Sequence, residues 1–175
     1  FNVTSIVTTT GFASFDYTGL GAFAGVLFFL LTFVGGCTGS TGGAIKIFRF
    51  QVMGRVVARS LRRSIHPHAV MPVRYGRQIL SNEQVGSVAV FVFLYLLTFV
   101  TVSILLSVMG LDAETAISAA AQAVGNVGPG IGPTVGPAGN FASLPDIAKL
   151  LLTVAMILGR LEILGVLVLF LPSFY

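Results

Sequence analysis

The sequence predicts an all-α integral membrane protein made of repeated units, in which a pore loop is followed by a membrane helix. The composition supports a lipid environment, because 55% of the 175 residues are hydrophobic and 9% are charged, against roughly 25% charged residues in a soluble domain. Long apolar segments and two short glycine-bearing segments alternate along the chain. The pattern therefore predicts two pore units, of which the first is partial.

Three segments are long and apolar enough to be membrane helices, which need about 20 residues. The first, from about 20 to 34, is somewhat short, and the second, from 85 to about 109, carries no charge. The third, from about 147 to 171, carries charges at Lys149, Arg160 and Glu162. We expect three crossings from hydropathy alone.

The basic residues are concentrated between the first two of these segments. Eight of the ten lie in residues 46–77, which contain no acid: Lys46, Arg49, Arg55, Arg59, Arg62, Arg63, Arg74 and Arg77. A basic stretch can bind nucleic acid, but between two apolar segments it is more typical of a cytoplasmic loop. We therefore expect the lipid bilayer and no nucleic acid as a partner. With 46–77 in the cytoplasm, the third helix runs inward and the C-terminus is also cytoplasmic.

Two segments fit neither a spanning helix nor an ordinary loop. Residues 1–12 end in VTTTGF, and residues 113–132 contain a short alanine-rich helix candidate followed by GNVGPG. The second segment must start and end on the outer side, which is typical of a re-entrant pore loop, since non-helical backbone at membrane depth needs protein or water around it. The chain thus divides into 1–83, the end of one pore unit, and 84–175, a complete unit. We expect it to be the C-terminal part of a longer polypeptide.

Selectivity filters replace the hydration shell of potassium with backbone carbonyls, sometimes helped by a threonine hydroxyl. Aligning the carbonyls needs unusual backbone angles, which glycine adopts easily. The candidate filter residues are Thr9, Thr10, Gly11, Phe12, Asn126, Val127 and Gly128. Among them we predict potassium at Thr10, Gly11, Val127 and Gly128. Each motif alone could be a surface turn, but two copies that each precede an inward-running helix favour a filter.

A glycine-rich loop follows the first apolar segment. It is no Walker loop, because Gly43 is followed by Ala44 and Ile45 and not by lysine and a hydroxyl residue. A flexible break below the filter would suit a gate, and a plain connector is the alternative. The predicted gate residues in this loop are Gly36, Cys37, Thr38, Gly39, Ser40, Thr41, Gly42 and Gly43.

Arg160 lies near the middle of the third apolar segment, where a charge is costly. Glu162 is two positions away, and such residues do not face each other on a helix. We therefore expect Arg160 to point into the protein and to belong to the gate. A structural ion pair with another part of the polypeptide is the alternative. No nucleophile and base lie together at membrane depth, so we expect no enzyme.

The motifs VTTTGF (7–12), GGCTGSTGG (35–43), IHPHAV (65–70), GNVGPG (125–130) and GRLEIL (159–164) resemble those of Trk-type potassium-uptake membrane subunits, the TrkH family of the Trk/Ktr/HKT superfamily. The resemblance implies a potassium-channel-like fold with four M1–pore loop–M2 repeats. The chain would hold the end of repeat three and all of repeat four. Two departures are Ala44, where the family often has glycine, and Gly125 before Asn126, where an asparagine pair is common.

The resemblance also implies function and partners. Potassium would be the substrate, with no covalently bound cofactor, in the inner membrane of a bacterium. Gly11 and Gly128 would be filter glycines, the glycine loop an intramembrane gate, and Arg160 a cationic barrier that contacts it. A homodimer and a cytoplasmic nucleotide-binding regulatory ring would be partners, besides the preceding repeats of the same polypeptide. A coupled secondary transporter of potassium or sodium is the alternative, although such proteins favour inverted repeats and the two units here run in the same direction.

Overall fold

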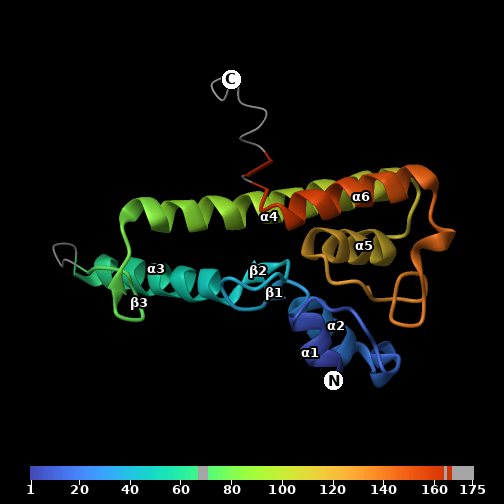
Figure 1. The fold of residues 1–175 in the computed structure, drawn as a ribbon, viewed down its shortest axis with the longest axis horizontal. Coiled ribbons are helices and arrows are strands. Elements are labelled where there is room, and N and C mark those ends of the chain that lie inside the picture. The colour runs from blue at the N-terminus through green and yellow to red at the C-terminus, as the bar shows by residue number, and fades with distance from the viewer. Residues whose placement is uncertain (67–70, 164, 167–175) are drawn as a thin grey trace, which may run out of the picture.

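The computed structural model describes residues 1–66, 71–163 and 165–166, and in them the predicted helical fold is confirmed (Figure 1). The α-helices are α1 (Asn2–Val7), α2 (Ala22–Leu31), α3 (Ile47–Ile65), α4 (Asn82–Val108), α5 (Ala113–Gly125) and α6 (Asp146–Arg160). Two short 3-10 helices are Tyr17–Leu20 and Phe141–Ser143. Two small ladders of two-residue strands were not predicted. They pair β1 (Val34–Gly35) with β2 (Ile45–Lys46) in parallel, and β3 (Arg74–Tyr75) with β4 (Gln78–Ile79) antiparallel.

The second predicted membrane helix is confirmed as α4. Its start is defined by a capping box, in which the Ser81 hydroxyl accepts a bond from the Gln84 amide (3.2 Å) and the Gln84 side chain accepts one from the Ser81 amide (2.9 Å). The helix then continues for 27 residues. Among the described residues it is the one helix long and apolar enough to cross a membrane.

The first predicted span, from about 20 to 34, corresponds to α2, and the predicted glycine-rich break separates it from α3. The third predicted span was wrong as a continuous helix. The third ends at Arg160 and continues as a turn in which Glu162 has a left-handed φ of 54°. Residues 164 and 167–171 of that predicted span lie outside the described part of the chain. The chain leaves the helix after α2 because the segment that follows is rich in glycine. The turn after α6 is stabilised by the ion pairs of Glu162, which are described below.

The main core is formed by α4, α5 and α6, which lie together in the upper part of Figure 1. Helix α5 begins where the Asp112 carboxylate accepts a hydrogen bond from the Thr115 amide (2.9 Å). Its alanines at 116, 119, 120 and 123 are fully buried. Small side chains let neighbouring helices approach closely, so α5 is enclosed by the longer helices and its carboxyl end is fixed in position.

Two smaller clusters attach the remaining helices. The first joins α1 and α2 through Ile6, Tyr17 and Phe28, and the Tyr17 and Phe28 rings stack with their centroids 3.9 Å apart. It also contains Val127 from the second predicted filter segment. The second joins α3 to the start of α4. The N-terminal helices therefore pack against the second predicted filter segment.

Gly159 is a point of very close approach between α6 and α5. A Cβ atom at this position would meet the carbonyl oxygen of Val124 and would lie 3.1 Å from Nδ2 of Asn126. We expect Gly159→Ala to destabilise the full-length protein by about 1–3 kcal/mol through overpacking. A lowered thermal midpoint in detergent would show this.

The matched control is Gly54→Ala in the middle of α3, where an added Cβ would meet nothing within 4 Å. Helical alanine is favoured over glycine by roughly 0.5–1 kcal/mol, so the control should melt at the same temperature or higher. Equal midpoints for both variants would contradict the assigned close approach.

Candidate functional site

The two predicted filter segments have the same backbone pattern. The first follows α1, and φ is 55° at Thr9 and 82° at Gly11. The second follows α5, and φ is 54° at Asn126 and 123° at Gly128. In both segments two residues with positive φ are separated by one without it. Such alternation turns successive carbonyl oxygens toward one side of the chain, which an ordinary extended strand cannot do.

Hydrogen bonds to the preceding helices hold both turns. The amides of Thr10 and Gly11 donate to the carbonyl of Ser5, at 2.9 and 3.3 Å. The amide of Val127 donates to the carbonyl of Gln122 at 3.2 Å. The side chain of Asn126 also donates from Nδ2 to the carbonyl of Met156 on α6, at 3.0 Å. The second segment is therefore supported by two neighbouring helices.

The two segments contact each other directly. A Cβ on Gly11 would meet the carbonyl oxygen of Val127, and a Cβ on Gly128 would lie 3.2 Å from Cα of Gly11. Of the remaining predicted filter residues, Thr10 bonds through its hydroxyl to that of Thr8 (2.9 Å), and the ring of Phe12 is exposed. The structure thus brings Gly11, Val127 and Gly128 together, while the ring of Phe12 takes no part in this contact.

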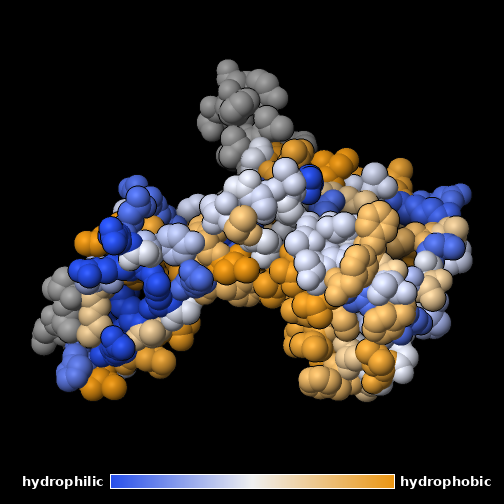
Figure 2. All heavy atoms as spheres, turned by 60° about the horizontal axis from the view of Figure 1, so that its bottom comes forward, coloured by the Kyte–Doolittle hydropathy of each residue, from blue (hydrophilic) through white to orange (hydrophobic). Residues whose placement is uncertain are grey.

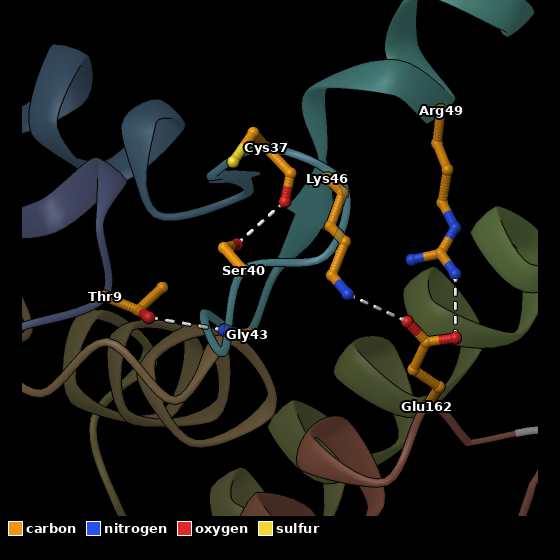
Figure 3. Close-up of polar contacts among 7 residues, drawn as sticks. All are labelled: Thr9, Cys37, Ser40, Gly43, Lys46, Arg49 and Glu162. Atoms are coloured by element: carbon orange, nitrogen blue, oxygen red, sulfur yellow. Dashed lines mark hydrogen bonds and ion pairs between the residues drawn. The ribbon is translucent and has the colours of Figure 1, made fainter.

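The glycine loop lies against both predicted filter segments. The amide of Gly43 donates a 3.2 Å hydrogen bond to Oγ1 of Thr9, as Figure 3 shows. A Cβ on Gly43 would meet the carbonyl oxygen of Gly125 and would lie 3.2 Å from Cβ of Asn126. A single glycine of the loop is therefore in contact with the first segment on one side and with the start of the second on the other.

The loop has a defined structure of its own. Its two ends are joined by the β1–β2 ladder, and in its middle the Ser40 hydroxyl and amide both donate to the carbonyl of Cys37, at 2.8 and 3.1 Å. Cys37 is a free, exposed thiol. Ala44 has a left-handed φ of 55°, so the departure from the family pattern falls at a position whose conformation favours glycine.

Arg160 ends α6 beside the glycine loop. It borders a cavity of about 200 Å³ whose wall also includes Ser40, Thr41, Gly42 and Gly43. The side chain is exposed in this chain and forms no ion pair with any described residue. Arg160 therefore lies next to the glycine loop, and its part in a gate stays a prediction.

The acidic residue beside the loop is Glu162, which lines the same cavity and which the sequence did not identify as a site residue. Its carboxylate oxygens lie 3.3 Å from Nζ of Lys46 and 2.9 Å from Nη2 of Arg49 (Figure 3). Arg49 is buried, and its guanidinium carbon lies 3.6 Å from the centre of the Phe91 ring. The turn after α6 is thus tied to the chain just after the glycine loop. The charge of Glu162 within an apolar segment was visible in the sequence, but its partners were not.

These features define a membrane protein with paired pore loops, and comparison with known proteins gives its family. The chain belongs to the family whose model is described as "TrkH: Cation transport protein", which matches residues 1–174. The Trk system potassium uptake protein TrkI of Halomonas elongata is 56% identical over all 175 residues, and TrkH of Vibrio parahaemolyticus is 38% identical over the same length.

A solved structure agrees with the fold. The crystal structure of the potassium transporter TrkH from Vibrio parahaemolyticus superposes with a TM-score of 0.87 and 38% identity, over 97% of this chain and 36% of that one. The chain also spans 36% of the length of each of the two curated relatives. The family resemblance inferred from the motifs is confirmed.

Proposed function

We propose that the chain forms part of the membrane subunit of a potassium-uptake system and supplies two of the segments that line its selectivity filter. The observation that carries this proposal is the contact between two segments with matched positive-φ residues, Thr9 and Gly11 in one and Asn126 and Gly128 in the other. The names of the relatives, which describe potassium uptake proteins, support potassium as the ion.

The mechanism follows from what the segments can offer an ion. A potassium ion entering the filter loses water and gains carbonyl oxygens, for which we propose Thr10, Gly11, Val127 and Gly128. The bonds to α1, α5 and α6 hold these segments in place, so the oxygens do not depend on flexible side chains. Two further segments, one from each preceding repeat of the same polypeptide, complete the ring in this proposal.

The gate is proposed to be the glycine loop from Gly36 to Gly43, with Arg160 beside it. The loop touches the filter segments at Thr9 and Asn126, which supports a place at the inner end of the path that the ion would take. Arg160 adds a positive charge next to the loop, which opposes cation passage. Opening then requires the loop to move away from both filter segments, and the ion pairs of Glu162 oppose that movement.

The setting of this proposal is the inner membrane of a bacterium, with residues 46–77 and the C-terminus in the cytoplasm. In this proposal residues 1–83 are the end of one pore unit, and residues 84–175 form the next unit. A homodimer and a cytoplasmic nucleotide-binding regulatory ring are the proposed partners. The concentration of basic residues on the α3 side supports the orientation through the positive-inside tendency.

The test is ion flux by the full-length protein in proteoliposomes with a potassium gradient and no proton or sodium gradient. A conduit should carry potassium and rubidium downhill at once, and should carry sodium much more slowly. A coupled transporter of potassium or sodium, the alternative function, would move little ion until a proton or sodium gradient is added. Such dependence would reject the conduit.

A further inference from the structure

A groove of about 530 Å³ lies between α3 and the segment that leads into the β3–β4 hairpin. Arg55, Arg59 and Arg62 of α3 line one side of it, and Arg74 of β3 lines another. The three helical arginines are four and three positions apart, so they share one face of α3. Both walls of the groove come from this chain.

The arginines of the groove have no acidic partner among the described residues. Glu162 pairs with Lys46 and Arg49, and Asp146 pairs with Lys149, while none of the four groove arginines is in an ion pair with a described residue. Residues 46–77 contain no aspartate or glutamate at all. Four guanidinium groups around one hollow repel one another, and an anion placed between them would relieve that repulsion.

The groove lies at the end of the membrane helix. Val73, on its wall, packs with Val85 and Val88 in the first turns of α4 and with Val52 of α3. Apolar side chains also follow α3 on an adjacent face, where Val57, Leu61 and Ile65 are exposed by 54, 65 and 73%. Figure 2 shows this arm of the molecule as a cluster of hydrophilic residues with hydrophobic patches at its border.

We propose that this groove binds the phosphate headgroup of an anionic phospholipid. Arginine matches phosphate through paired N–H donors, and basic pockets at the membrane surface bind such headgroups. A soluble phosphate would use only the arginines. A lipid also uses the neighbouring apolar face, with its acyl chains against Leu61 and its neighbours, so the combination favours a lipid.

The experiment uses the full-length protein in detergent and native mass spectrometry to count bound phosphatidylglycerol during titration. The variant Arg59→Gln/Arg62→Gln removes two groove arginines. The control Arg63→Gln/Arg77→Gln removes the same charge from residues 46–77 at positions that do not line the groove. With about 1 kcal/mol per basic residue near a charged lipid, we expect binding to weaken by about thirtyfold in the first variant and little in the control.

Four outcomes would overturn the proposal. Equal weakening in both variants would mean that only total charge matters. If phosphatidylcholine were retained as well as phosphatidylglycerol, the groove would not distinguish the charge of the headgroup. If millimolar inorganic phosphate fully displaced the bound phosphatidylglycerol, the groove would be a site for a soluble anion. If the unchanged protein did not retain phosphatidylglycerol, the lipid proposal would be rejected, and an acidic protein surface would be the remaining partner for the groove. Since lipid binding is measured without ion flux, this result is independent of the proposed conduction.

Discussion

Replacement of Gly128 by serine in the full-length protein is expected to abolish selective potassium uptake. Gly128 has a φ of 123°, which L residues rarely adopt, and an added Cβ would lie 3.2 Å from Cα of Gly11. The segment must therefore change its backbone angles or move away from its neighbour. Either change turns at least one carbonyl away from the proposed ion path.

The measurement is growth and rubidium uptake in a bacterium that lacks its own potassium transporters. We expect at least a hundredfold loss of uptake, which is about 2.7 kcal/mol of lost stabilisation of the ion in the path, or a loss of preference for potassium over sodium. Gly110→Ser is the matched control, because Gly110 also has a positive φ (90°) but an added Cβ there would meet nothing within 4 Å.

The control shares the backbone strain and should keep both uptake and ion preference, provided that both variants reach the membrane in similar amounts. If Gly128→Ser transported potassium as selectively as the unchanged protein, Gly128 would be a turn residue only. The proposed filter would then be rejected for the second segment.

Substitution of Glu162 by glutamine is expected to open the pathway. The neutral side chain keeps its size but loses both ion pairs, to Lys46 and to Arg49. It also leaves Arg49 buried without its acid, and breaking a buried pair in this way costs about 3–5 kcal/mol, reduced here because Glu162 is about half exposed. The glycine loop is then held less firmly, and we expect potassium flux to rise several-fold under conditions in which the unchanged protein is closed.

Single-channel or liposome flux measurements would test this, with Asp146→Asn as the control. That change likewise neutralises an acid in an ion pair, but Asp146 lies in α6 and pairs with Lys149, three residues along the same helix. Both residues are far from the loop in sequence. A charge exchange, Glu162→Arg with Arg49→Glu, should restore part of the closed behaviour. Reduced flux in Glu162→Gln at normal protein levels would contradict the tether and point to a role in the ion path.

The parts of the fold that local sequence determines were predicted well. The uninterrupted apolar segment predicted α4, and the alanine-rich segment predicted α5. The loop of glycine and hydroxyl residues predicted the break between α2 and α3. The unusual backbone angles expected at the two glycines of the predicted filter are found at Gly11 and Gly128, whereas the positive φ angles of Thr9 and Asn126 were not predicted. The role of both segments in binding an ion stays a prediction.

The break after Arg160 could not be predicted in the same way. Leu161, Glu162 and Ile163 contain no glycine or proline, and leucine and glutamate favour helices. The left-handed conformation of Glu162 is accompanied by contacts with Lys46 and Arg49, more than a hundred residues earlier in the chain. This conformation depends on tertiary contacts, and local helix propensity carries no information about them.

The position of Gly43 has a consequence for genetics. Because its backbone touches Thr9 on one side and Gly125 with Asn126 on the other, mutations in the proposed gate and in the proposed filter should show epistasis. A substitution that enlarges Gly43 would displace carbonyls of the proposed filter as well as the loop, and second-site suppressors of it should arise at Thr9 or Asn126. Screens for leaky uptake and screens for altered ion preference should therefore recover overlapping sets of residues.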